Sequence, residues 1–435
     1  MPRMCNWRRA AVVAAVVVGF AGPAVSGQQA APPAPDIAAL QATIEQLRQQ
    51  LDALERKVAA LQSAPATAVQ PAAPTPAPAA PVAAAEPAPV APALAAPGGD
   101  SGPVPVYGNT SAASKIFNPD MAVIGNFVGS AGRNAVAPLP ALSLNEAEVS
   151  FQAVVDPYAR ADFFLAASPD GLEVEEGFLT FPTLPGGLLV KVGKLKAQFG
   201  KINTLHAHTL PWVDEPLPMK NLLGGDEGLN DAGVSVSRLI PNSVMFLEAT
   251  GEVYNGDNGV FTSQKRSDLT YVGRLRGYRD LTEGTNLDLG TSFAFGHNDT
   301  RPDATTRLFG VDATIRYRPL RRAIYKRFLG RTELFWSRRD TATLDDQADA
   351  FGAYVSGDYQ FARRWFAGGR YDWSDRAEDP TRRDTSGSVL LTYWPSEFSQ
   401  IRGQFRRTAY AEGVDANEVL FQFLFSIGAH GAHSF

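Results

Sequence analysis

The sequence predicts an all-β fold, a closed transmembrane β-barrel of about sixteen antiparallel strands, preceded by an N-terminal coiled-coil helix and a linker rich in alanine and proline. Three observations lead to this prediction. The C-terminal segment alternates between large apolar residues and others, about fifteen upstream segments repeat this alternation, and the connections between segments alternate between long and short. A period of two is the pattern of a β-strand with one apolar face.

The C-terminal segment, residues 419–427, has the clearest strand pattern. Large apolar side chains occupy every second position, among them Val419, Phe421, Phe423 and Phe425. The residues between them are mixed in polarity, so only one face is uniformly apolar. Nine to eleven residues are roughly the length with which a tilted strand crosses a bilayer. The segment is therefore long enough to span a membrane.

The same parity continues to the aromatic residue at the end of the chain, Phe435. In this respect the chain resembles bacterial outer-membrane barrels, in which the closing strand ends with an aromatic residue that the barrel-insertion machinery reads. The resemblance implies that Phe435 is a barrel-closing signal and that the insertion machinery is a partner of this protein.

Strand-like alternation recurs from residue 121 onward. In residues 146–155, for example, Val149 and Phe151 alternate with Glu148 and Ser150. Many of these segments exceed the five or six residues typical of strands in soluble proteins, and their apolar rows often end in Tyr or Trp, as in the aromatic girdles of membrane barrels. We expect strands near residues 121–128, 145–155, 159–167, 172–181, 188–199, 232–239, 244–253, 268–278, 286–296, 307–317, 324–337, 349–361, 364–373, 387–394, 397–409 and 417–428.

The connections between these segments support the count independently. Those after the odd-numbered segments are mostly long, whereas those after the even-numbered segments are mostly short. Outer-membrane barrels have short periplasmic turns and longer external loops, and an even number of strands returns both termini to the periplasm. We therefore assign the long connections to the outside. The longest, residues 200–231, is the third external loop and is expected to form a constriction.

The segment that precedes the barrel begins with a predicted signal peptide at residues 1–27. Arg3, Arg8 and Arg9 form a positive start, and an apolar run and small residues follow. The single cysteine of the chain, Cys5, lies in this segment, so we expect the mature protein to have no thiol and no disulfide. These features are consistent with a protein of the Gram-negative envelope.

Residues 36–63 are predicted to form a coiled coil. Their apolar residues are separated alternately by three and four positions: Ile37, Leu40, Ile44, Leu47, Leu51, Leu54, Val58 and Leu61. A stripe this narrow needs another copy of itself, and its composition favours a parallel dimer, although porin barrels are usually trimers. The alternative, a single helix lying on a membrane, is less favoured because the polar face carries both signs of charge.

Residues 64–105 are mostly alanine and proline and are predicted to be a disordered linker. Proline-rich chain extends by about 3.1 Å per residue, so the linker can span roughly 100 Å. The barrel domain, residues 106–435, would then sit in outer-membrane lipid, with the coiled coil in the periplasm, where peptidoglycan is a potential partner.

Overall charge and motifs exclude several functions. The chain has 40 basic and 45 acidic residues, so nothing indicates nucleic-acid binding. It contains no nucleophile elbow, phosphate loop or zinc helix. We therefore predict no enzymatic activity, no catalytic residues and no cofactor.

The segment from Lys191 to Pro241, which begins KVGKLKAQFGK, and the C-terminal GAHGAHSF carry a resemblance to a known family. Over residues 105–435 the chain resembles outer-membrane barrels related to the phosphate-selective porins O and P, some of which are labelled zinc-regulated TonB-dependent receptors. The resemblance implies a sixteen-stranded porin, often with an N-terminal coiled coil. The receptor label does not transfer, because residues 28–105 are too few for a plug domain. The phosphate site does not transfer either, because no motif aligns its arginines.

The polar rows of the predicted strands are expected to face the barrel interior and to line a wet pore. Early strands contribute carboxylates and later strands contribute arginines, which would create a transverse field that favours polar solutes over lipids. Mutually paired charges that stiffen the wall are the alternative. The predicted pore-lining residues are Glu146, Glu148, Glu173, Glu175, Lys191, Arg274, Arg276, Arg316, Arg364, Arg370, Arg402 and Arg406.

The third external loop also contains the strongest metal-ligand candidates, His206, His208 and Asp214. A His-x-His pair in a loop without a thiol is more often a hydrogen-bonded loop element than a metal site, so we predict no metal. A second pair, His430 and His433, falls at the predicted periplasmic rim.

Two functions from different classes follow from the sequence. The first is an outer-membrane channel for passive diffusion of small polar or ionic solutes. The second is an envelope tether, in which the barrel anchors a periplasmic stalk and coiled coil. A metal-related outer-membrane transporter is a further alternative. The solute, the ion selectivity and the oligomer number do not follow from the sequence.

Overall fold

The computed structural model describes residues 119–168, 171–343 and 346–428. The predicted signal peptide, coiled coil, linker and closing signal at Phe435, together with His430 and His433, lie outside these residues. Within the described part of the chain, no helix is both long enough and apolar enough to cross a membrane.

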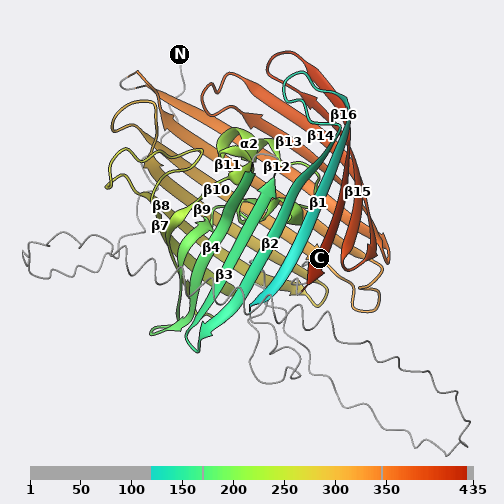
Figure 1. The fold of residues 1–435 in the computed structure, drawn as a ribbon, viewed down its shortest axis with the longest axis horizontal. Coiled ribbons are helices and arrows are strands. Elements are labelled where there is room, and N and C mark those ends of the chain that lie inside the picture. Colours follow the sequence, from blue (N-terminus) through green and yellow to red (C-terminus); the bar gives the residue numbers. More distant parts are fainter. Residues whose placement is uncertain (1–118, 169–170, 344–345, 429–435) are drawn as a thin grey trace, which may run out of the picture. The chain divides into compact units, whose positions relative to one another are not determined.

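Sixteen strands form one closed antiparallel barrel, in which each strand pairs with the next and β1 pairs with β16 (Figure 1). Each predicted strand corresponds to one observed strand, so the predicted sixteen-stranded antiparallel barrel is confirmed. The strands are β1 (Asp120–Arg133), β2 (Leu142–Asp156), β3 (Ala159–Ser168), β4 (Gly171–Leu184), β5 (Leu188–Lys196), β6 (Asn230–Leu239), β7 (Phe246–Tyr254), β8 (Thr270–Thr282), β9 (Thr285–His297), β10 (Thr305–Tyr317), β11 (Arg327–Asp340), β12 (Gln347–Ala362), β13 (Trp365–Asp375), β14 (Arg383–Ser396), β15 (Ser399–Ala409) and β16 (Asp415–Gly428).

The period-two pattern decides which face of each strand is outside. On β9, Phe293 is 47% exposed on the outer face, whereas Asp288 on the inner face is 1% exposed. A row of aromatic side chains crosses four neighbouring strands near the long connections: Phe309, Trp336, Phe351 and Trp373, with adjacent ring centroids 5.1–5.5 Å apart. Apolar outer rows with aromatic borders are the surface that a bilayer requires.

The connections largely alternate in length as predicted. The longer set comprises residues 134–141, 169–170, 197–229, 255–269, 298–304, 341–346, 376–382 and 410–414, and the shorter set comprises 157–158, 185–187, 240–245, 283–284, 318–326, 363–364 and 397–398. The exceptions are 169–170, which is short, and 318–326 and 240–245, which are long for their set. The predicted long connection after β1 is shorter than expected, because β1 and β2 extend further than the alternation indicated.

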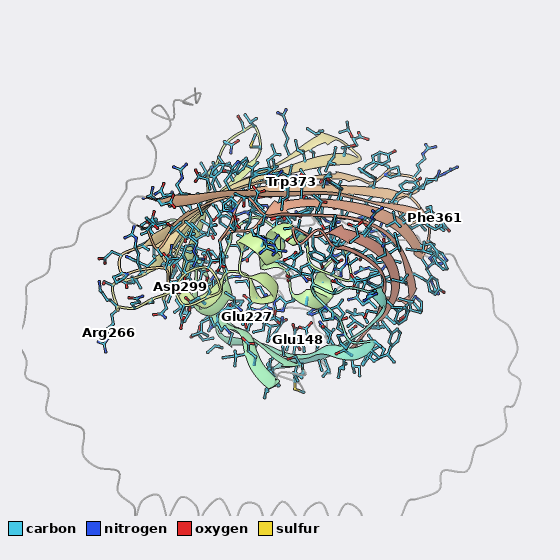
Figure 2. The ribbon with its side chains drawn as sticks, turned by 90° about the horizontal axis from the view of Figure 1, so that it is seen from above. Glu148, Glu227, Arg266, Asp299, Phe361 and Trp373 are labelled. Atoms are coloured by element: carbon cyan, nitrogen blue, oxygen red, sulfur yellow. The ribbon has the colours of Figure 1, made fainter. Side chains whose placement is uncertain are left out.

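The third long connection, residues 197–229, is named loop 3 here, and it lies inside the barrel (Figure 2). It contains the short helices η2 (Ile202–Thr204), η3 (Ala207–Thr209), α2 (Leu217–Leu222) and η4 (Gly225–Glu227). The hydrophobic core joins loop 3 to apolar residues on the inner face of the strands. The interior is therefore packed at the level of loop 3.

Candidate functional site

The two ends of loop 3 are fastened together at its neck. The Ala197 N–H donates to the Leu229 carbonyl over 2.8 Å. The side-chain amide of Asn203 donates to the carbonyls of Ala197 and Leu229, and its oxygen accepts the Leu229 N–H. Because one side chain satisfies both ends, loop 3 leaves and rejoins the wall at one place and behaves as a closed Ω-type loop.

Backbone N–H groups of loop 3 attach directly to the barrel wall. Glu333 on β11 accepts the N–H groups of Lys201 and Ile202, at 2.8 and 2.9 Å. Gly200, which precedes them, has a φ of +62°, and a Cβ at this position would lie 2.3 Å from the Glu333 carboxylate. Glycine adopts this conformation without steric cost, and its missing Cβ leaves room for the Glu333 carboxylate.

The Lys201 ammonium lies inside the barrel, 3.1 Å from Asp288 on β9. Burial lowers the pKa of Lys201 to about 8, and the nearby Arg316 and Arg276 lower it further, against the opposing effect of Asp288. The charged lysine is therefore only partly compensated, and at neutral pH it raises the energy of the packed loop.

The apolar part of loop 3 packs across the interior. Trp212 is fully buried, with its ring edge-on to Tyr354 at a centroid distance of 5.3 Å. Phe199 stacks on Phe335 at 6.0 Å. Leu223 is also fully buried in this cluster. These contacts fix loop 3 against β11 and β12, so it is a packed part of the barrel.

A group of arginines on β13 and β15, named the arginine wall here, holds the middle of loop 3. Arg370 and Arg406 contact the Asp214 carboxylate at 2.9 and 2.8 Å. Gln404 also donates to this carboxylate. Burial alone would raise the pKa of Asp214, but the two guanidinium groups outweigh it and hold the pKa below the usual 3.8.

The arginine wall is completed by bonds to backbone and to neighbouring strands. Arg402 donates to the Leu210 carbonyl over 2.8 Å and to Gln422 over 2.9 Å. Arg370 is paired with Asp372, and Arg406 with Glu418. Arg370 and Arg406 therefore share three carboxylates, those of Asp214, Asp372 and Glu418, whereas Arg402 donates to uncharged oxygen atoms. Over the whole set, guanidinium groups and carboxylates are equal in number.

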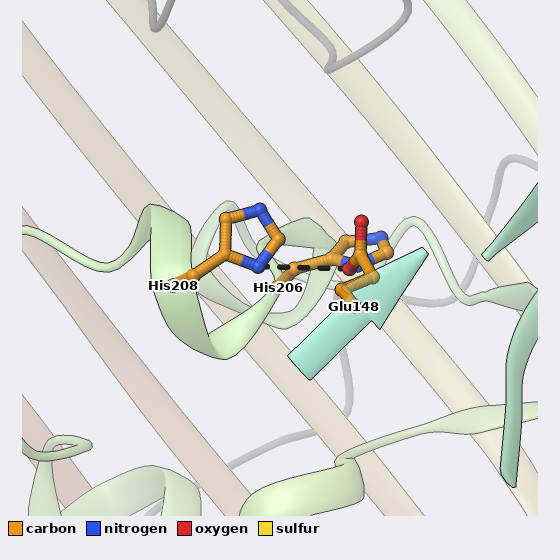
Figure 3. Close-up of side chains that lie close together, drawn as sticks. All are labelled: Glu148, His206 and His208. Carbon is orange, nitrogen blue, oxygen red and sulfur yellow. Dashed lines mark hydrogen bonds and ion pairs between the residues drawn. The ribbon is translucent and has the colours of Figure 1, made fainter. Parts of the chain in front are cut away.

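A second polar group, named the histidine cluster here, joins loop 3 to β2 and β4. Figure 3 shows Glu148 of β2 with His206 and His208 of loop 3. His206 Nδ1 lies 2.7 Å from Glu148 Oε2 and 3.2 Å from Glu175 Oε2, and His206 Nε2 lies 2.7 Å from Glu176 Oε2. Burial alone would lower the pKa of His206, but the three carboxylates raise it well above 6.5. The members of the cluster are Glu146, Glu148, Glu175, Glu176, His206 and His208.

A β-bulge explains why two consecutive carboxylates face the same histidine. Phe164 and Leu165 of β3 pair with Glu176 and Val174 of β4, which leaves Glu175 as the extra residue. A bulge re-aims a side chain that regular alternation would direct to the other face. The pairing of β1 with β2 skips Asn145 in the same way, one residue before Glu146.

His208 lies beside His206 on loop 3, with ring centroids 5.7 Å apart. Its Nδ1 is 3.5 Å from Glu148 Oε2 and 3.7 Å from Glu146 Oε2. Potential ligand atoms of Glu148, His206 and His208 lie within 4.8 Å of one another, and the same holds for Glu146, Glu148 and Glu175. Oxygen and imidazole donors thus converge on one buried point.

The structure brings together two of the three predicted metal-ligand candidates. His206 and His208 converge with Glu148, but Asp214 belongs to the arginine wall. The grouping of Asp214 with the histidines is therefore wrong, because its carboxylate is engaged by Arg370 and Arg406.

Several predicted pore-lining residues face inward but do not meet water. Glu146, Glu148, Arg274, Arg370, Arg402 and Arg406 are all buried. The expectation that these arginines line a wet pore is wrong, because loop 3 or wall carboxylates cover them; the side chain of Arg370 is 0% exposed. They are wall struts, as the alternative interpretation held.

The other predicted pore-lining residues have different surroundings. Glu175 is half-buried and belongs to the histidine cluster, and Glu173 is exposed and pairs with Lys194. Arg364 is exposed and lies in the turn 363–364, so its prediction as a strand residue is wrong. Three keep partial exposure inside the barrel: Lys191 over the ring of Phe178, and Arg276 and Arg316 near Asp288.

Glu176 is a residue that the sequence interpretation missed, although a signal was present. The outward apolar positions change parity between Val174 and Leu179, which are both exposed on the outer face. A change of parity within one strand indicates a bulge. Three other residues were also missed, because no local sequence pattern marks them. Trp212 packs loop 3 into the interior, and Gln404 and Glu333 accept backbone N–H groups of loop 3.

The sequence matches no model of a known protein family. It is 32% identical over 336 residues to a protein of Aquifex aeolicus (strain VF5) described as an uncharacterized protein, covering 67% of this chain and 70% of that one. The structure is similar to a loop L8 deletion mutant of OmpT, an outer membrane protein of Vibrio cholerae, with a TM-score of 0.50 and 11% identity, covering 71% of this chain and 98% of that one. An anion-selective porin from Comamonas acidovorans has a TM-score of 0.49 and 11% identity, over 71% of this chain and 98% of that one. The fold is that of an outer-membrane barrel, and the chain belongs to the same family as the Aquifex aeolicus protein.

Proposed function

We propose that the protein is an outer-membrane channel for passive diffusion of small polar or ionic solutes, in which loop 3 forms the constriction. The observation that carries this proposal is a closed sixteen-stranded barrel with a polar inner face and a loop fixed inside it. Barrels of this size are wide enough to leave an aqueous channel around a folded-in loop. We expect the predicted coiled coil, residues 36–63, to join copies of the chain in the periplasm.

The part of the interior next to the short turns supports a water-filled entrance. On β10 and β11 the inward arginines there keep contact with solvent: the side chain of Arg316 is 31% exposed and that of Arg331 is 18% exposed. At the level of loop 3, in contrast, the inward arginines are buried. This difference is the one expected of a vestibule that narrows toward a constriction.

Removal of loop 3 tests its role as the constriction. Because the neck is closed between Ala197 and Leu229, residues 199–227 can be replaced by a two-residue turn with little disturbance of β5 and β6. The expected result in planar bilayers is a conducting wild type and a larger single-channel conductance for the loop-deleted variant. A variant shortened at residues 298–304, outside loop 3, should conduct as the wild type does. Equal conductance with and without loop 3 would contradict the constriction.

Arg316 and Arg331 are the inward cations best placed to act on permeant ions. Changing both to glutamine should shift the reversal potential across a salt gradient toward cation preference, because exposed charges act on ions within roughly 10 Å at 0.1 M salt. The same change at the buried Arg402 should have little effect on reversal potential. A shift of the reversal potential in the Arg402 variant, with none in the variant of Arg316 and Arg331, would contradict the vestibule.

The packing of loop 3 favours a second candidate function. Loop 3 contacts β2, β4, β7, β9, β11, β13 and β15, which lie all around the ring. A barrel closed by such a plug would act as an envelope tether that anchors the periplasmic stalk. No conductance in the wild type, together with conductance in the loop-deleted variant, would favour the tether.

A further inference from the structure

We propose that Glu148, His206 and His208 form a binding site for a divalent transition-metal ion of the zinc class, which fastens loop 3 to the barrel wall. The donor set is two imidazoles and a carboxylate, with the carboxylates of Glu146 and Glu175 beside them. Imidazole nitrogen combined with carboxylate oxygen suits zinc, whereas calcium and magnesium prefer oxygen donors alone. The proposal concerns binding and goes beyond the diffusion function.

The geometry of the donors points to one position for the ion. The Nδ1 atoms of His206 and His208 both face Glu148 Oε2, at 2.7 and 3.5 Å. Ligands of a tetrahedral zinc ion lie roughly 3.3 Å apart, because its bonds are about 2.0–2.1 Å long. Side-chain movements on the order of 1 Å would therefore bring the three donors onto one ion.

The far side of His206 already has the arrangement that supports a metal ligand. Its Nε2 faces Glu176 Oε2 at 2.7 Å, and the other oxygen of Glu176 accepts the Lys196 N–H at 2.8 Å. Metal-binding histidines usually donate their second ring N–H to a carboxylate or carbonyl, which fixes the ring and raises its basicity. Glu176 is thus placed to orient His206 while Nδ1 binds the ion.

An independent observation is that acceptors in the cluster lack donors. Glu146 is 6% exposed, and its Oε2 has no hydrogen-bond partner among the described residues; Glu175 Oε2 also accepts no hydrogen bond there, since the nearby His206 Nδ1, 3.2 Å away, is directed at Glu148. A buried carboxylate oxygen without a donor costs free energy unless something else compensates it. A divalent cation between these groups would supply that compensation.

The charge of the cluster agrees with this interpretation. Four carboxylates, those of Glu146, Glu148, Glu175 and Glu176, lie around the two imidazoles, and one lysine, Lys196, pairs with Glu175. The carboxylates therefore outnumber the lysine by three. A divalent ion bound among them would offset two of these negative charges.

Zinc binding by the full-length protein in detergent tests the proposal. After removal of metals with a chelator, equilibrium dialysis against zinc chloride should leave one tightly held equivalent per chain, measured by elemental analysis. His208→Gln should lose this equivalent, and Glu176→Gln should weaken binding about 10- to 100-fold. Cobalt(II) at the site should give a visible absorption band that His208→Gln removes.

Controls separate this site from other histidines. His297→Gln changes a histidine on β9 outside the cluster, and His430→Gln with His433→Gln changes the C-terminal pair; both variants should keep the bound zinc. If His208→Gln fails to form a heat-modifiable barrel, Glu146→Gln replaces it and should weaken binding. Absence of the bound equivalent in the wild type, its persistence in His208→Gln, or its loss with His430 and His433 would overturn the proposal. None of these outcomes depends on conductance, so the site and the channel can fail separately.

Discussion

The arginine wall and the histidine cluster both hold loop 3 with buried charge, but they differ in charge balance. The arginine wall contains three guanidinium groups and three carboxylates; Arg370 and Arg406 contact the carboxylates of Asp214, Asp372 and Glu418, and Arg402 donates to uncharged oxygens. In the histidine cluster, four carboxylates surround two imidazoles, and the one lysine that contacts them is Lys196, which pairs with Glu175. Equal numbers of the two charges make the arginine wall a structural anchor, whereas the excess of carboxylates in the histidine cluster favours a bound cation.

The largest effect is expected from breaking the balanced set. Asp214→Ala leaves Arg370 and Arg406 facing each other without their shared carboxylate. Removing one partner from a buried ion pair costs about 3–5 kcal/mol. The free energy of unfolding in urea, measured on the refolded barrel in detergent, should fall by this amount, and loop 3 should become sensitive to protease. An unchanged free energy would show that Asp214 does not anchor the loop.

A pH series extends the comparison to Lys201, whose charge is also poorly compensated. Its pKa is about 8 in the folded protein, against 10.5 in the unfolded chain. Between these values the unfolded state binds more protons, so the free energy of unfolding should rise with pH through this window, by up to about 3 kcal/mol. Below pH 8 both states are protonated and the cost is present in full.

The matched variant for this pH series is Lys201→Met, which keeps the length of the side chain and removes the charge. The rise of the free energy of unfolding between pH 8 and pH 10.5 should be missing in this variant. Parallel curves for the two proteins would contradict the assignment to Lys201.

Removing a carboxylate charge from the histidine cluster should instead raise the free energy of unfolding. With metal removed by a chelator, Glu146→Gln takes away a buried carboxylate charge that has an oxygen without a donor. The free energy of unfolding should therefore increase, by on the order of 1 kcal/mol. With zinc added, the wild type should have the higher free energy of unfolding of the two proteins. A loss of stability in chelator, as in Asp214→Ala, would show that both sets are ordinary anchors.

The smallest effect is expected where charges meet at the surface. Arg338 and Asp349 form an exposed pair, 2.6 Å apart, at the loop ends of β11 and β12. Exposed pairs contribute about 0–1 kcal/mol and are screened by salt. Asp349→Asn should change the free energy of unfolding by less than this, and less again at high salt. A larger loss of free energy of unfolding would mean that burial does not explain the difference between this pair and the ion pairs that hold loop 3.

The sequence by itself determined the barrel. Alternation such as Val149 and Phe151 against Glu148 and Ser150 fixes which face of a strand meets lipid, because a slip of one residue would expose every polar side chain. Repeated along the chain, it gave the number and order of the strands and the long and short connections. It also singled out His206 and His208, since two histidines in one loop are visible without a structure.

Only the tertiary structure decided what the inward residues do. Alternation directs Arg370, Arg402 and Arg406 inward, but it contains no information on whether water or loop 3 meets them there. That depends on contacts between residues more than 150 positions apart, such as Asp214 with Arg370. Glu175 and Glu176 face the same histidine because of a bulge that depends on the pairing of β3 with β4. Strand periodicity is a local property, whereas charge compensation inside the barrel is set by the packing of loop 3 against distant strands.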